Sequence, residues 1–142
     1  MHNNQLQAAA QRVANAYASI ANEKMGCTLP LPVPLKFNLQ DSKPKWAGIA
    51  CGTMRVNLNM ILLEDNVTEM LNETIPHEIA HLVQYNKFDH KGGNTQCHGA
   101  EWQEIMRKLG KKPTKTHTMD VSRAVAHYKT IKKTKKQLKE IE

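Results

Sequence analysis

The sequence predicts an α+β fold in which an N-terminal helix, a small three-stranded sheet and two later helices share one core. Apolar residues repeat at helical spacing near the N-terminus, alternate with polar residues between positions 35 and 58, and return to helical spacing from position 67. The 142 residues are enough for one ordinary domain. We expect residues 1–128 to form that domain and residues 129–142 to form a basic tail.

The first expected helix runs from about Asn4 to Glu23, a stretch without glycine or proline. Its apolar positions are Leu6, Ala9, Ala10, Val13, Tyr17 and Ile20. A stripe with this period is the apolar face of an amphipathic helix, which we expect to pack on the sheet. Pro30, Pro32 and Pro34 then predict an extended connector, because proline cannot donate a backbone hydrogen bond.

Two alternating runs predict two strands of the sheet, and the stretch before the second run supplies the third. Residues 35–39 and residues 54–58 each alternate apolar with polar side chains, as a half-buried strand does. The second run follows residues 46–51 across Gly52, and this spacing predicts a β-hairpin.

Helical spacing returns from Val67 to about Lys87, with Pro76 inside the run. The helix should kink or restart at Pro76, because proline lacks an N–H group and crowds the carbonyl four residues earlier. Residues 87–97 are expected to form a loop, which would control access to the metal site that the motif described below predicts. A shorter helix should follow and end at Gly110, with Trp102, Ile105, Met106 and Leu109 on its apolar face.

The last part of the chain gives a weaker pattern. Residues 121–128 predict a short helix. The lysine-rich run after it is expected to be a solvated helix or a disordered tail.

The sequence His77-Glu78-Ile79-Ala80-His81 matches H-E-x-x-H inside a predicted helix, which is the context that this motif requires. Four residues make about one helical turn, so both imidazoles can reach one metal ion. A catalytic zinc ion has three protein ligands and an open position for water. Glu78 can reach that water as general base, while zinc lowers the pKa of the water and polarises the scissile carbonyl. The motif therefore predicts a zinc metalloendopeptidase, a hydrolase with one Zn²⁺.

The motif leaves the third metal ligand open between three residues. His90 lies in the polar loop, His98 opens the next helix, and Glu101 lies within that helix. Gly99 would let the backbone pass close to the metal helix.

Residues 75–82, with the sequence IPHEIAHL, together with residues 98–102, with the sequence HGAEW, resemble the metalloprotease core of the SprT and Spartan family. Residues 50–66 are similar to the stretch before that family's metal helix, and the likeness spans roughly residues 5–120. It implies a minimal zincin-like domain. It also implies that the third ligand is the histidine of the H-G-x-E-[WF] element, here His98.

The resemblance bears on other residues around the ligands. With His98 as ligand, Glu101 would either orient a metal ligand without binding the metal itself or have a structural role. Tyr85 shares the side of the helix with both motif histidines and is expected at the cleft. His117 lies in a Thr-His pair that the family also shows, which suggests a role near the site. Trp46 and Trp102 are expected in the core or the cleft wall.

The family resemblance implies a DNA-linked role, in which the enzyme cleaves DNA-associated or DNA-crosslinked proteins with weak sequence preference. The net charge of +7 agrees with contact to single- or double-stranded DNA, because polyanions favour positive surfaces. Six lysines are concentrated near the end of the chain, without an acidic residue among them: Lys129, Lys132, Lys133, Lys135, Lys136 and Lys139. Many bacterial members end in a zinc ribbon, whereas this sequence has no cysteine after Cys97.

The remaining expectations concern location and rival functions. Residues 1–7 do not have the pattern of a secretory signal, and no apolar run is long enough to span a bilayer, so we expect a cytoplasmic monomer with no membrane contact. Association with the nucleoid stays open. Two rivals stay open. One is a DNA-binding or regulatory module with structural zinc and no turnover, and the other is a metallopeptidase independent of DNA.

Overall fold

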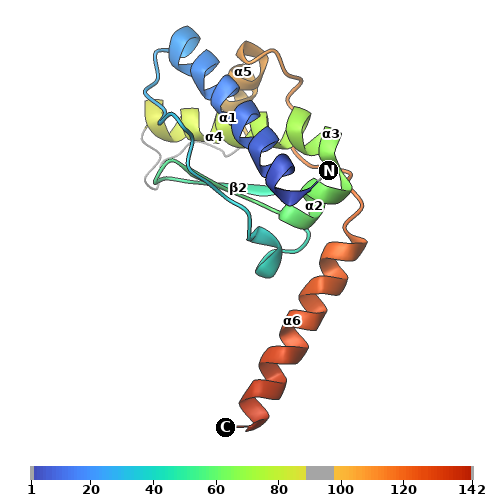
Figure 1. Ribbon diagram of the computed structural model, residues 1–142. Helices are drawn as coiled ribbons and strands as arrows, with labels where there is room; N and C mark the ends of the chain where they lie inside the picture. The colour runs from blue at the N-terminus through green and yellow to red at the C-terminus, as the bar shows by residue number, and fades with distance from the viewer. Residues whose placement is uncertain (1, 89–97, 142) are drawn as a thin grey trace.

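The computed structural model describes residues 2–88 and 98–141, and it is a mixed structure of helices around a small sheet (Figure 1). The helices are α1 (Asn3–Met25), α2 (Met60–Asp65), α3 (Val67–Glu69), α4 (Ile75–Phe88), α5 (Ala100–Lys108) and α6 (Ser122–Ile141). The strands are β1 (Leu35–Lys36), β2 (Gly48–Cys51) and β3 (Arg55–Leu58). A 3₁₀ helix η1 (Leu39–Asp41) and a π-helical turn η2 (Met70–Thr74) complete the order. The predicted fold class is confirmed.

The sheet has the strand order β1-β3-β2, with β1 parallel and β2 antiparallel to the central strand β3. The hairpin of β2 and β3 was predicted, and it pairs Gly48 with Leu58 and Cys51 with Arg55. Strand β2 is therefore an edge of the sheet.

Strand β1 is shorter than predicted, because the chain leaves the sheet after Lys36. The side chain of Asn57 accepts a hydrogen bond from the backbone N–H of Asn38 at 3.2 Å and donates one to the Asn38 side chain at 2.9 Å. These side-chain bonds replace the backbone pairing that would have continued the strand. Leu39 is buried in η1 instead.

Helix α1 packs mainly on α4, whereas packing on the sheet was expected from the sequence. Its buried stripe consists largely of alanine: Leu6, Ala10, Ala14, Ala18, Ala21 and Met25. The larger residues Val13, Tyr17 and Ile20 are only partly buried. Small side chains let two helices approach closely, so the alanine stripe rather than the bulkier positions forms the contact.

Helix α4 is the central element, because it packs against α1, α5 and strand β2 (Figure 1). The π-helical turn η2 comes directly before it, and Pro76 lies in its first turn. The backbone is helical from η2 into α4, with the N–H of Ile75 bonded to the carbonyl of Met70, so the wider π-turn precedes a proline that lacks an N–H group of its own. The face of α4 away from the site is buried through Ile75, Ile79, Leu82 and Val83.

Helix α6 is longer than the predicted helix at residues 121–128, since it continues through the lysine run to Ile141. Only Ala124 of this helix is buried, and the helix extends away from the body (Figure 1). The predicted boundary between domain and tail at residues 128 and 129 falls inside it and stays a prediction. In the described part of the chain, no helix combines the length and the apolar composition that crossing a membrane requires.

Candidate metal centre

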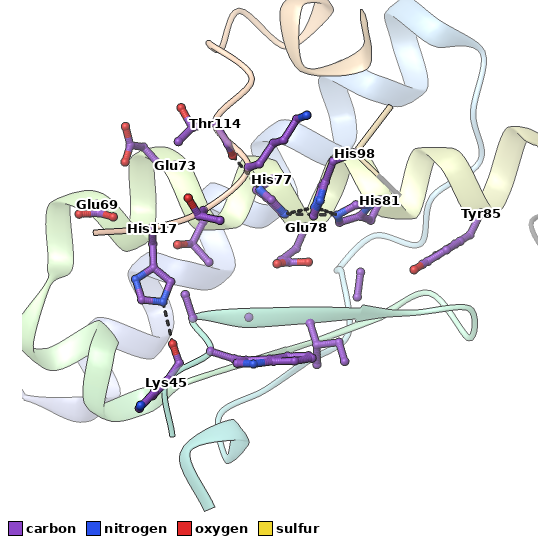
Figure 2. A pocket seen from close by; sticks show the side chains of 18 residues that line it. Lys45, Glu69, Glu73, His77, Glu78, His81, Tyr85, His98, Thr114 and His117 are labelled. Atoms are coloured by element: carbon purple, nitrogen blue, oxygen red, sulfur yellow. Dashed lines mark hydrogen bonds between the residues drawn. The ribbon is translucent and has the colours of Figure 1, made fainter. Parts of the chain in front are cut away.

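Three imidazoles meet at one point in the structure. The Nε2 atoms of His77 and His81 are 3.2 Å apart, and the Nε2 atom of His98 lies 3.1 Å from each (Figure 2). His77 and His81 are one turn apart on α4, and His98 stands just before α5. Within residues 2–88 and 98–141, this is the group of histidine, cysteine and acidic side chains arranged to hold a metal ion.

The hydrogen bonds of two rings fix which nitrogen carries the proton. His77 Nδ1 lies 3.2 Å from the carbonyl oxygen of Thr114, and His81 Nδ1 lies 2.8 Å from Oε1 of Gln84. Both oxygens accept, so each Nδ1 must donate. In a neutral imidazole the Nε2 atom then carries a lone pair.

The rings are held in that neutral form. Burial lowers the pKa of His77 to about 3 and that of His81 to about 4, and the neighbouring histidines add to the effect at His77. Burial also lowers the pKa of His98. Unprotonated nitrogens that face one another at 3.2 Å repel, and a cation between them would turn this repulsion into attraction.

The spacing of the nitrogens fits a metal ion. Four tetrahedral ligands with metal–nitrogen bonds of about 2.0–2.1 Å lie about 3.3–3.4 Å apart. The observed separations of 3.1 and 3.2 Å are close to this value. The three histidines could therefore hold one metal ion.

Of the three candidates for the third ligand, the structure places His98 in the cluster. Glu101 lies behind it, where its Oε1 accepts a hydrogen bond from Nε2 of Gln84 at 3.3 Å. A chain of contacts thus runs from His81 through Gln84 to Glu101. His90 lies outside the described residues, as does most of the predicted gating loop at residues 87–97.

Gln84 and the carbonyl of Thr114 were not predicted from the sequence. Gln84 is buried and lies one turn after His81 on the same side of α4. This helical spacing from a metal-ligand candidate is the sequence feature that could have identified it. The carbonyl of Thr114 has no signal in the sequence, because any residue can supply that oxygen. Both groups orient a ring whose other nitrogen faces the centre.

Glu78 is buried between α4 and strand β2, and Figure 2 shows its carboxylate on the sheet side of the three rings. Burial raises the pKa of Glu78 to about 8, although the backbone N–H of Ala50 donates a hydrogen bond that opposes the shift. A dication nearby would favour the carboxylate form again. Glu78 thus borders the centre without belonging to the nitrogen cluster.

A cleft of about 660 Å³ opens over the centre between β2, α4 and residues 114–117. Tyr85 lines it, with its ring centroid 6.5 Å from that of His81. His117 also lines it but stands apart from the three histidines, because its Nε2 donates to the carbonyl of Lys45 at 2.7 Å. That bond ties residues 114–117 to the segment before β2.

The two tryptophans occupy different places around this cleft. Trp102 is fully buried, and its indole N–H donates to the carbonyl of His77 at 3.3 Å. Its predicted place in the core is confirmed. Trp46 lines the cleft wall and is 49% exposed.

Comparison with known proteins gives one consistent result. The model of the SprT-like family matches residues 32–127. The chain is 30% identical over 118 residues to Protein SprT of Yersinia pseudotuberculosis serotype O:1b, covering 82% of the chain and 65% of the relative. It is 37% identical over 99 residues to Protein SprT of Pseudomonas putida, covering 68% of the chain and 57% of the relative. The chain thus spans less than two thirds of the length of these relatives. No solved structure matches it significantly.

Proposed function

The chain belongs to the SprT-like family, and we propose that it is a zinc-dependent endopeptidase that cleaves DNA-associated or DNA-crosslinked proteins with weak sequence preference. The observation that carries the proposal is the meeting of three neutral imidazoles beside the buried carboxylate of Glu78 in an open cleft. Location in the cytoplasm and a monomeric state stay predictions.

The choice of zinc rests on the donor set. Three histidine nitrogens with one further position open to the cleft are typical of catalytic zinc rather than of a closed structural site. His77, His81 and His98 would hold the ion. Zinc, when bound, lowers the pKa of a water molecule and polarises a carbonyl.

Glu78 is the residue that would move the proton. As a carboxylate it would take a proton from the water and later give it to the leaving amine of the cleaved peptide bond. The Glu78 side chain packs against position 48 of strand β2, which limits where its carboxylate can lie before substrate arrives. Preorganised contacts of this kind cost no rearrangement during the reaction.

Strand β2 would bind the substrate backbone. Its only partner among the described strands is β3, and residues 46–50, which include most of β2, line the cleft. An extended peptide can therefore add as a further strand and form main-chain hydrogen bonds. Because such bonds do not depend on side chains, weak sequence preference follows.

The proposed role of DNA rests on charge. The six lysines between positions 129 and 139 stand on α6, where phosphates could be neutralised without regard to sequence. Binding enzyme and substrate to one polymer would raise their effective concentration.

The test is a cleavage assay on a basic protein bound to DNA, with DNA added or withheld and the metal content of the enzyme measured. The wild type should cleave the substrate, and Glu78→Gln should keep its metal but lose about 10²–10⁴-fold in rate. A metal-loaded wild type without turnover would favour a DNA-binding module with structural zinc. Cleavage that DNA does not affect would favour a DNA-independent peptidase.

A further inference from the structure

A second hollow, of about 380 Å³, lies between the segment before β2 and the first half of α6. It is lined by Ser42, Lys43, Pro44, Lys45, Trp46, Val125, Tyr128, Lys129 and Lys132. Among these described residues there are four lysines and two aromatic rings, but no acidic side chain. The hollow is thus positive and carries flat apolar surfaces.

The two aromatic rings are accessible, and each has an ammonium group nearby. Trp46 is 49% exposed, and Nζ of Lys43 lies 5.0 Å from the centre of its ring. Nζ of Lys132 lies 5.5 Å from the centre of the Tyr128 ring. Cation–π pairs that are open to solvent are weak, so a ligand can displace the ammonium from the ring.

Helix α6 is anchored beside the hollow, so its lysines have a defined place there. The guanidinium of Arg123 bonds the carboxylate of Asp65 at 3.0 Å and that of Glu64 at 3.2 Å. His127 contacts the carboxylate of Asp41 at 3.2 Å. Lys129 and Lys132 follow within two turns of His127.

The hollow adjoins the catalytic cleft. Lys45 and Trp46 line both, since they stand at the junction between the segment 42–46 and strand β2. A ligand in the hollow would therefore lie next to the entrance for substrate.

We propose that this hollow binds single-stranded nucleic acid, with unpaired bases stacked on Trp46 and Tyr128 and with Lys43, Lys129 and Lys132 on the phosphates. Base stacking on aromatic side chains needs an unpaired base, whereas the bases of a duplex are already stacked on one another. An acidic peptide would satisfy the lysines but leave the exposed rings without a matching partner. The inference deepens the proposed function, since it places the nucleic acid beside the protease cleft.

The experiment measures the affinity of the full chain for a fluorescent oligothymidine and for an abasic oligomer of the same length. Stacking is worth about 1–3 kcal/mol per base, so the wild type should bind the oligothymidine at least about tenfold more tightly. Trp46→Ala should remove most of that difference, and Trp46→Phe should retain more of it. Equal affinity of the wild type for both oligomers, or no effect of Trp46→Ala, would overturn the proposal.

Paired lysine variants separate the hollow from general attraction by the helix. Lys129→Gln/Lys132→Gln and Lys133→Gln/Lys136→Gln remove the same charge from α6, but only the first pair lines the hollow. The first variant should lose several-fold more affinity than the second, and equal losses would contradict the proposal. Peptidase activity without nucleic acid is measured in the same preparations. If the protein cleaves its substrate but binds both oligomers equally well, only the proposed nucleic-acid site is refuted. If binding depends on the bases but no cleavage occurs, only the proposed peptidase activity is refuted.

Discussion

A β-carbon on Gly48 would lie 3.1 Å from Cγ and 3.3 Å from Oε2 of Glu78. Contacts this short are rare for real β-carbons, so the edge strand and the glutamate can approach as they do only because position 48 has no side chain. On the same strand, the backbone N–H of Ala50 favours the carboxylate form of Glu78. Strand β2 therefore lies directly against the proposed general base.

Gly48→Ala is predicted to lower kcat by about tenfold to a hundredfold, because an added methyl group must displace the carboxylate. Metal content should stay unchanged, since the three atoms nearest to such a β-carbon belong to Glu78 and Leu58 and not to a histidine. Gly52→Ala is the matched control, because a β-carbon there would meet nothing within 4 Å. Wild-type kcat in Gly48→Ala would show that this close approach does not matter for catalysis.

Gln84→Leu is predicted to weaken metal binding by about 10–100-fold, because it removes the acceptor that orients the ring of His81. Competition with a metal chelator measures the affinity. Asn86→Leu is the control, since Asn86 lies on the same helix but bonds Thr28, away from the centre. If the two variants hold metal equally well, Gln84 does not orient the ligand.

The metal-free protein should lose stability as the pH falls from 6.5 towards 4.5. The pKa values of His77 and His81, about 3 and about 4 in the fold, lie below the usual 6.5, so the unfolded chain binds more protons in this range. The thermal midpoint in the presence of a chelator should therefore fall with acid. A midpoint that rises on acidification across this range would contradict the neutral state of the rings.

Glu78 should act in the opposite direction over the whole range from its usual pKa of 4.5 to about 8. Below pH 6.5 the two histidines outweigh it, whereas between pH 6.5 and 8 the effect of Glu78 dominates. Its pKa of about 8 means that the folded metal-free protein keeps a proton that the unfolded chain has already lost, so stability should fall as the pH rises. In Glu78→Gln this decline should be absent. Parallel thermal midpoints of the two proteins from pH 6.5 to 8 would rule out the buried, protonated carboxyl.

Ala14→Leu is predicted to destabilise the fold by about 1–3 kcal/mol, because Ala14 is fully buried in the stripe of α1 that faces α4. Ala16→Leu, on the exposed side of the same helix, should leave the free energy of unfolding nearly unchanged. Chemical denaturation measures both. Equal stabilities would mean that α1 does not pack through its alanines.

The sequence predicted the features that a short local pattern determines. The H-E-x-x-H motif gave two members of the nitrogen cluster, and alternation with a turn gave the hairpin of β2 and β3. The alanine stripe of α1 was not predicted, because burial of alanine depends on how closely a neighbouring helix approaches and not on hydrophobicity alone. The contact between Gly48 and Glu78 joins residues that are far apart in the sequence, so no local pattern contains it.

The full length of α6 could not be predicted from the sequence pattern either. Its second half has no apolar face that would require a helix, and the six lysines gave equal support to a solvated helix or a tail. The helix starts from contacts of Arg123 and His127 with acidic residues that lie more than fifty positions earlier in the chain. Local composition does not reveal such contacts.

The three-histidine centre is tested most directly by the zinc content of the purified wild type and of His98→Ala, measured after dialysis against trace metals. We expect one zinc ion per wild-type chain, and a large loss of zinc and of peptidase activity in a variant that still folds. A wild type that binds no metal, or a His98→Ala variant that keeps full zinc occupancy, would contradict the three-histidine centre.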